Sequence, residues 1–237
     1  MTPHPTLHWP PLLRGTLVRR YKRFLADVRL DGGETVTAHC PNSGKMTECA
    51  EPGRPIYLSR SDNPKRKLKF TWELIEMPDS LVGVNTQTPN RLVAESIRQG
   101  RIPELDGYDD IHREVAVGQN SRIDLMLQRA GGDTCLVEVK NCTLVKNGVA
   151  AFPDAVTARG RKHLGEMARQ SKRGIRCVGV YLIQRMDAEV FTPADDIDPE
   201  YGKLLRKHQG REIEVLAYDV DLDLDGISVR RRLPCRF

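Results

Sequence analysis

The stretch SRIDLMLQRAGGDTCLVEVKNCT, residues 121–143, decides the fold of the second half of this chain. Two runs of alternating apolar and polar residues, 122–127 and 135–142, flank a polar segment that contains Gly131 and Gly132. Paired glycines allow the positive φ that a tight reversal of the chain requires. We therefore predict a β-hairpin.

Charged residues stand in the middle of both predicted strands. Because side chains alternate between the faces of a strand, Glu138 and Lys140 share one face, and a suitable register places Asp124 on the same face. Burying such charges is costly unless they are paired or bind a metal. Two carboxylates and a neighbouring carbonyl are hard oxygen ligands, so the sequence predicts a site for Mg²⁺ or Mn²⁺. A lysine beside the ion is suited to act on the attacking water.

The spacing of these residues also resembles a known pattern. Asp124, thirteen residues, and then Glu138-x-Lys140 form the core of the PD-(D/E)xK nuclease pattern, except that Ile123 stands where the pattern has proline. The alternative is a surface hairpin in which Glu138 and Lys140 form an ion pair of little energetic value.

Composition sets broad limits on the class of protein. The chain has 237 residues and a formal net charge of +5, with most of the positive excess in the first third. This length allows one large domain or two small ones, and the basic bias favours a polyanionic partner. The six cysteines show no zinc spacing, which predicts free thiols in a reducing cytoplasm. The sequence predicts neither a secretion signal nor a membrane span.

The region from Leu13 to Thr86 has the pattern of short strands bounded by Gly, Pro, Asp or Asn. The predicted strands are 17–20, 24–30, 35–39, 56–59, 68–77 and 81–84. Five or six short antiparallel strands in this length favour a small OB-like barrel, a fold with a nucleic-acid-binding face.

Basic and aromatic residues of this region are candidate DNA contacts, since they neutralise phosphates or stack on bases. The candidates are Arg19, Arg20, Lys22, Arg23, Lys67, Lys69 and Trp72. For Trp72, a place in the barrel core is the favoured alternative.

The pattern changes to that of a helix at Thr88. Thr88-Pro89 is typical of a helix start, and an apolar stripe follows with a period of about 3.6 residues as far as Gly100. We therefore divide the chain into an OB-like domain, residues 1–86, and a second domain, residues 87–237. Glu95 lies at the edge of the stripe and is a candidate third metal ligand. The alternative is an ordinary solvent-facing glutamate.

A second helix is predicted from about Val156 to Arg173, and its excess of Lys and Arg suits phosphate contacts. The candidate DNA contacts of this half are Arg122, Arg159, Arg161, Lys162 and His163. The alternative is a solvated basic helix. Beyond it, a strand at 177–183, a helix at 199–208 and a strand at 213–219 predict an α/β domain with a mixed sheet around the hairpin. The arginines of 230–232 predict a basic patch.

Several short motifs follow one another along nearly the whole chain. They are HCPNSG at 39–44, PNRLV at 89–93, SRID at 121–124, EVKNCTL at 138–144, FPDA at 152–155 and RGRKHL at 159–164. In this order they resemble the sugar fermentation stimulation protein A family. The resemblance implies a cytoplasmic DNA-binding protein with an N-terminal OB-like domain and a C-terminal PD-(D/E)xK nuclease-like α/β domain. It also implies DNA binding without sequence preference and a regulatory role in sugar, particularly maltose, metabolism.

On that resemblance Asp124, Glu138 and Lys140 match the nuclease-type site, and Glu95 matches it less closely. The leading hypothesis is a Mg²⁺-dependent DNA nuclease. The alternatives are a DNA-binding regulatory or accessory protein without turnover, and a small-molecule or RNA-processing enzyme that uses both folds. The sequence leaves open whether DNA is single- or double-stranded, the cleavage polarity, the regulatory target, and whether the protein is a homodimer.

Overall fold

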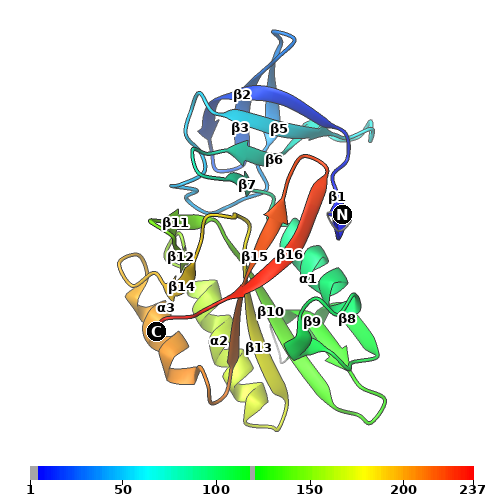
Figure 1. The fold of residues 1–237 in the computed structure, drawn as a ribbon, viewed down its shortest axis with the longest axis vertical. Coiled ribbons are helices and arrows are strands. Elements are labelled where there is room, and N and C mark those ends of the chain that lie inside the picture. The colour runs from blue at the N-terminus through cyan, green and yellow to red at the C-terminus, as the bar shows by residue number, and fades with distance from the viewer. Residues whose placement is uncertain (1–4, 118–120) are drawn as a thin grey trace.

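The chain forms a β-barrel that sits on one end of a larger mixed sheet (Figure 1). The structure is a computed structural model that describes residues 5–117 and 121–237. Residues 1–4, which the predicted first domain included, and 118–120 lie outside the described residues.

Five strands close the barrel, in the order β2-β3-β4-β6-β5 and back to β2. All neighbours are antiparallel except β4 and β6, whose parallel pairing of Ala38 with Phe70 completes the closure. This is the predicted OB barrel. Its strands are β2 (Leu12–Tyr21), β3 (Leu25–Leu30), β4 (Thr35–His39), β5 (Pro55–Arg60) and β6 (Phe70–Glu76). A short further strand, β7 (Leu81–Gly83), pairs antiparallel with β6.

Trp72 lies in the core of this barrel, so its prediction as a DNA contact is wrong. Its side chain is fully buried, and its indole N–H donates to the backbone carbonyl of Leu74 at 3.0 Å. Both neighbours, Thr71 and Glu73, are buried too, because β6 has the barrel core on one face and the second domain on the other. A ring enclosed in this way cannot stack on a base.

The second domain is built on a seven-stranded sheet with the order β1-β16-β15-β13-β10-β9-β8 in the described residues. The three central strands β10, β13 and β15 are parallel and the outer pairings are antiparallel, as predicted for a mixed sheet. The predicted hairpin is β9 and β10, and Gly132 in its turn has a φ of +93°. The bounds are β1 (Leu7–His8), β8 (Asp110–Val117), β9 (Ser121–Gln128), β10 (Thr134–Cys142), β13 (Arg176–Ile183), β15 (Glu214–Leu222) and β16 (Gly226–Leu233).

Helices cover both faces of this sheet. The apolar side of α1 (Thr88–Arg98) packs on one face, and α2 (Ala158–Ser171) and α3 (Pro199–His208) pack on the other. A short 3-10 helix, η1 (Pro103–Leu105), follows α1, and a small sheet consists of β11 (Leu144–Lys146), β12 (Val149–Phe152) and β14 (Val190–Pro193). None of the described helices is both long and apolar enough to cross a membrane.

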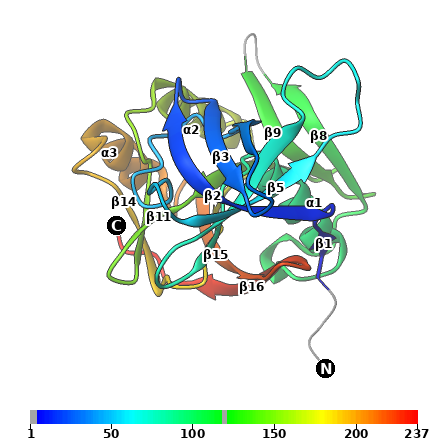
Figure 2. The same ribbon diagram turned by 90° about the horizontal axis from the view of Figure 1, so that it is seen from above.

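Viewed from above, the barrel strands lie over the second domain (Figure 2), and the two share an apolar cluster. Tyr57 and Leu74 of the barrel belong to the same apolar cluster as α1, and the N–H of Gly83 donates to the carbonyl of Gln184 at 2.9 Å. The N-terminal strand β1 pairs with β16 and therefore belongs to the second sheet, unlike the predicted division. Apart from β1, the division between residues 86 and 87 stays a prediction.

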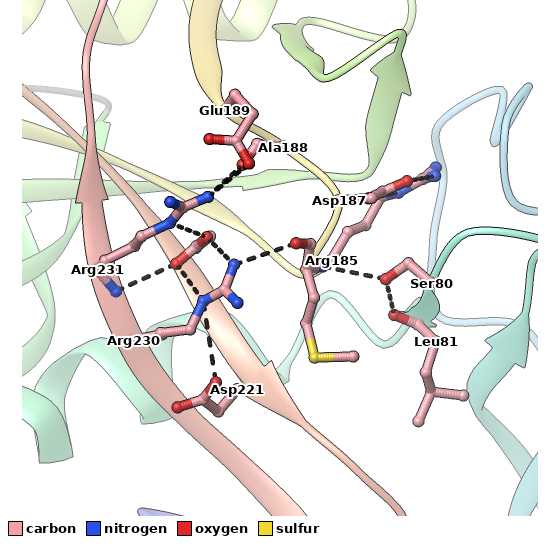
Figure 3. Close-up of polar contacts among 11 residues, drawn as sticks. Ser80, Leu81, Arg185, Asp187, Ala188, Glu189, Asp221, Arg230 and Arg231 are labelled. Atoms are coloured by element: carbon pink, nitrogen blue, oxygen red, sulfur yellow. Dashed lines mark hydrogen bonds and ion pairs between the residues drawn. The ribbon is translucent and has the colours of Figure 1, made fainter.

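The predicted basic patch at residues 230–232 is wrong, because all three arginines are paired. They lie on β16, a strand that the sequence analysis did not predict, where Arg230 and Arg231 both bind the buried carboxylate of Asp219. Arg231 also bonds Glu189 at 3.0 Å (Figure 3). Arg232 pairs with Glu104 at 2.6 Å. The positive charge of this segment is therefore balanced by the carboxylates that its arginines bind.

Candidate active site

Glu138 occupies the middle of β10, one of the three parallel strands at the centre of the sheet. Val137 and Val139 on either side of it pack toward α1, whereas Leu136 packs toward α2. Alternation therefore turns the Glu138 side chain to the α2 face, where it is 3% exposed. A carboxylate buried this deeply requires partners that offset the loss of hydration.

One oxygen of Glu138 has two cationic or polar partners. Its Oε1 accepts from Nζ of Lys140 and forms a close hydrogen bond with Nδ1 of His163 on α2. Burial acts to raise the pKa of Glu138, but the His163 bond and the Lys140 charge outweigh it and hold that pKa below its usual range. The group is therefore an anion at neutral pH.

The other oxygen of Glu138 has no partner. Among the described residues, the buried side-chain polar atoms that lack a hydrogen bond are Oε2 of Glu138, Oγ of Ser96 and Oε1 of Gln184. Glu138 is the only one of the three that carries a charge, so its free oxygen is the costliest of them to leave unpaired. This atom is free to accept a further donor or a cation.

Asp124 lies beside Glu138, because β9 and β10 pair in a register that allows it, a point that the sequence left open. The pairing of β9 with β10 runs to Leu125 opposite Val137, and the next position along sets Asp124 opposite Glu138. There the strands part, and Oδ2 of Asp124 accepts the N–H of Val139 at 2.8 Å in place of a backbone carbonyl. Burial and the charge of Glu138 raise the pKa of Asp124. A divalent cation between the two carboxylates would relieve this repulsion.

Asn90 is the site residue that the sequence analysis missed. It stands in the first turn of α1, and its amide donates to Oδ1 of Asp124 at 2.8 Å. Both oxygens of Asp124 are thus held in place by neutral donors, one from β10 and one from α1. Asn90 lies inside the PNRLV motif, which was the one sequence signal that pointed to it.

These residues open into a cleft of about 760 Å³ between the two domains. Asp124, Glu138 and Lys140 line it together with Val139, and the barrel contributes its own residues to the opposite wall. The barrel residues are Arg20, Arg23, Ser43, Gly44 and Lys45. Arg159, at the start of α2, lines the cleft as well. Apart from Asp124, Glu138 and Asp154, the charged residues that line the cleft are all basic.

Glu95 is not part of this site, and its prediction as a metal ligand is wrong. It pairs with Arg98 at 3.4 Å and accepts from Gln99 at 3.2 Å, and it does not line the cleft. The first turn of α1, with Asn90, faces Asp124, and five residues later the helix has turned by about 140°. Glu95 therefore points away from the carboxylates.

The predicted DNA contacts separate into two groups. Arg23 and Arg159 line the cleft and are exposed, whereas Lys22, Lys67, Lys69, Arg122 and Lys162 are exposed outside it. Others already serve the fold. Arg19 pairs with Asp27 at 2.8 Å, Arg161 pairs with Asp198 at 2.7 Å, and Arg20 donates to backbone carbonyls.

His163 is buried rather than presented to DNA, so its prediction as a DNA contact is also wrong. The ring is 8% exposed and bonds Glu138, which lies 25 residues earlier in the chain. The face of α2 that carries His163 packs on the sheet. This packing places His163 beside Glu138, where it holds the carboxylate by a hydrogen bond.

The donors present fit a hard divalent cation. Within residues 5–117 and 121–237 no three His, Cys, Asp or Glu side chains cluster as a complete metal cage. Two carboxylates with a free oxygen and a nearby backbone carbonyl are instead the donor set of an ion that keeps several waters, as Mg²⁺ does. The predicted three-carboxylate set is reduced to Asp124 and Glu138.

The structure is an OB barrel joined to an α/β domain, in which Asp124, Glu138 and Lys140 lie together with the sequence spacing of the PD-(D/E)xK pattern. The chain belongs to the sugar fermentation stimulation protein family. The family's "SfsA N-terminal OB domain" matches residues 18–84, and its "Sugar fermentation stimulation protein RE domain" matches residues 87–226.

Close relatives cover almost the full chain. A sugar fermentation stimulation protein homolog of Geotalea uraniireducens is 53% identical, over 95% of this chain and 97% of the relative. The homolog of Pelobacter propionicus is 55% identical with the same coverage. The solved structure of Pyrococcus furiosus SfsA in complex with Ca²⁺ is 26% identical, covers 98% of this chain and 99% of that one, and has a TM-score of 0.90.

Proposed function

We propose that this protein hydrolyses phosphodiester bonds of DNA with the help of Mg²⁺ or Mn²⁺, without sequence preference. One observation carries the proposal. Glu138 is a buried anion with one oxygen held by Lys140 and His163 and the other left without a partner, next to Asp124 in a cleft lined by several basic residues. Buried charged oxygens are nearly always paired in native proteins, so the unpaired oxygen of Glu138 calls for a ligand.

The residues that would hold the cation are Asp124, Glu138 and the carbonyl of Val139. A metal bound there supplies charge stabilisation to the phosphoryl oxygens and lowers the pKa of a water. The complex of the Pyrococcus furiosus relative with Ca²⁺ supports a divalent cation as the ligand class.

The protein's own side chains have separate tasks. Lys140, half-buried against Oε1 of Glu138, orients the attacking water and stabilises the negative charge that develops during the attack. His163 holds the Glu138 carboxylate from behind, and Asn90 with the N–H of Val139 holds that of Asp124. These contacts leave each carboxylate little freedom to rotate, which preorganises the site.

DNA binding in this proposal is mainly electrostatic. Arg23, Lys45 and Arg159 line the cleft, and the exposed basic residues of the barrel and α2 extend the positive surface. If about five phosphates are neutralised on duplex DNA, log K falls with log salt with a slope near −4.5. A slope close to zero would contradict electrostatic binding of DNA phosphates.

The second candidate is a DNA-binding regulator without turnover. The observation that favours it is that only two carboxylates converge in the described residues. The family name suggests a link to sugar metabolism. We propose a cytoplasmic location for either function, since all six cysteines are free thiols and five of them are buried.

The deciding experiment compares wild type with Lys140→Ala. Each protein is incubated with single- and double-stranded DNA in Mg²⁺, Mn²⁺ or EDTA, and both product length and DNA retention are followed. The nuclease predicts metal-dependent shortening that Lys140→Ala lowers about a hundredfold or more while retention stays unchanged. Retention without shortening in every metal would instead establish the regulator.

A further inference from the structure

A loop of the barrel forms the wall of the cleft that faces the carboxylates. It is the segment Asn42-Ser43-Gly44-Lys45-Met46, the 42–46 loop, between β4 and β5. Ser43, Gly44 and Lys45 line the cleft with Asp124 and Glu138. The loop therefore belongs to one domain and borders the site of the other.

Arg20 holds this loop from the barrel side. Its Nη2 donates to the carbonyls of Asn42 at 2.8 Å and Gly44 at 2.9 Å, and its Nη1 donates to that of Lys45 at 3.1 Å. Its Nε donates to the carbonyl of Arg23 at 3.1 Å. The rigid fork of a guanidinium suits such multiple bonds, and lysine could not replace it. Arg20 thus shapes the loop, and its donors are occupied by backbone rather than left for phosphate.

Asp154 holds the same loop from the second domain. Its Oδ2 accepts the N–H of Met46 at 3.2 Å, across 108 residues of sequence. A Cβ atom on Gly44 would lie 2.1 Å from Oδ2 of Asp154, so the carboxylate packs directly on the glycine backbone. The N–H of Gly44 is satisfied by Oδ1 of Asn42 at 2.8 Å. Side chains from both domains therefore set the position of the 42–46 loop.

The position of the loop leaves two phosphate-binding groups in the cleft. Lys45 is exposed and has no ion-pair partner among the described residues, and Ser43, two positions earlier, is an exposed residue that also lines the cleft. Across the cleft stand Lys140 and Arg159. A lysine ammonium and a hydroxyl are ordinary ligands of phosphate oxygens.

We propose, on the basis of the proposed function, that the 42–46 loop positions the substrate. Lys45 and Ser43 bind the DNA phosphate that flanks the scissile one, and Arg20 and Asp154 are positioning residues that hold the loop against the site. Asp154 serves as a hydrogen-bond acceptor for the loop and not as a metal ligand. The barrel is then a part of the active site and not only a separate DNA-binding platform.

The first test separates substrate binding from chemistry. Lys45→Ala should raise KM for DNA about tenfold, the worth of one charge-assisted contact, with kcat within about threefold. The matched control is Lys203→Ala, an exposed lysine on α3 outside the cleft, which should leave both constants within about twofold. An unchanged KM in Lys45→Ala would overturn the assignment of Lys45.

The second test concerns the role of Asp154. Asp154→Asn keeps an oxygen that can accept the N–H of Met46, so it should retain most of the activity, whereas Asp154→Ala should raise KM about tenfold. A metal ligand would behave differently, because both variants remove the charge. Equal loss in both, together with loss of stabilisation by Mg²⁺, would overturn the positioning role.

The third test uses the close approach at Gly44. Gly44→Ala should raise KM about as much as Asp154→Ala, and in the Asp154→Ala background it should add less than about twofold, because the atom it meets is gone. Full additivity of the two changes would contradict the contact. Thermal unfolding of each variant shows whether it is folded.

The loop and the proposed function can fail separately. If the wild type cleaves DNA and KM is unchanged in the Lys45 and Gly44 variants, only the proposed role of the 42–46 loop is overturned. If the wild type never cleaves DNA, the proposed nuclease activity is overturned. DNA retention in EDTA then tests whether the 42–46 loop binds DNA. In that case Lys45→Ala should still weaken DNA binding about tenfold relative to Lys203→Ala, and equal retention would overturn the loop as well.

Discussion

Two buried carboxylates of the central sheet, Asp219 and Glu138, have opposite surroundings. Asp219 on β15 is fully buried, and its Oδ1 accepts from Nε of Arg230 and from the backbone N–H of Arg231, each at 3.1 Å. Its Oδ2 accepts from Nε of Arg231 at 3.1 Å and from a further nitrogen of Arg230. Glu138 on β10, two strands away, uses only one of its oxygens.

The difference between them shows that burial of a charge does not by itself mark a functional site. Asp219 is saturated by donors from β16, and those arginines continue to Glu189 and Asp221 in a network that pins β16 to the sheet (Figure 3). Glu138 has hydrogen bonds to Oε1 that keep it charged, and its Oε2 has no hydrogen-bond partner. The first arrangement stabilises the fold, and the second leaves room for a ligand.

The largest expected effect is on cleavage and comes from Glu138→Gln. The amide keeps an oxygen for Lys140 and His163 and removes the repulsion with Asp124, so the free energy of unfolding should fall by about 2 kcal/mol or less, a smaller loss than that expected for Asp219→Asn. Cleavage should fall about a thousandfold, because several kcal/mol of charge stabilisation is lost at tenfold per 1.36 kcal/mol. Single-turnover rates and denaturant unfolding measure the two quantities. Full activity in this variant would refute the comparison.

The opposite result is expected for Asp219→Asn. Removing the charge leaves Arg230 and Arg231 without their shared partner, which should destabilise the fold by about 3 kcal/mol. The lower end of the usual range applies because the arginine side chains remain 29% and 45% exposed. Below the unfolding transition, cleavage should stay within about threefold of wild type. A large loss of cleavage in a folded Asp219→Asn would show that the two carboxylates are not independent.

Stabilisation by Mg²⁺ sharpens the comparison without measuring activity. At a concentration a hundredfold above Kd, Mg²⁺ should stabilise the wild type by about 2.7 kcal/mol through mass action. Asp124→Asn should lose this shift and keep DNA retention in EDTA, whereas Asp219→Asn should keep the shift. Melting curves across a Mg²⁺ titration measure it. Absence of any shift in the wild type, even with DNA present, would count against the metal site.

The smallest expected effect is that of Glu95→Gln. Glu95 makes a surface ion pair with Arg98, and such pairs contribute about 0.5 kcal/mol or less. Stability, the Mg²⁺ shift and cleavage should all stay close to wild type. A loss of the Mg²⁺ shift in this variant would restore Glu95 as a ligand and contradict the position that α1 gives it.

The elements with strong local signals were predictable from the sequence. The helix at 199–208 has the predicted bounds, and the hairpin, the OB barrel and the mixed sheet are confirmed. Strand β16 was missed, because its run of arginines resembles a solvated segment until Asp219 is seen beneath it. Strand alternation showed that Asp124 and Glu138 can share a face, and the register of β9 on β10 in the structure places them opposite each other.

The remaining parts of the site depended on packing between distant segments. Asn90 meets Asp124 across 34 residues, His163 meets Glu138 across 25, and Met46 meets Asp154 across 108. The sequence placed the chemistry on β9 and β10 because residue type and period are local. Only the tertiary structure could decide which side chains surround Asp124 and Glu138. The apolar clusters on the two faces of the sheet set the rotation of α1 and α2 and the position of the barrel.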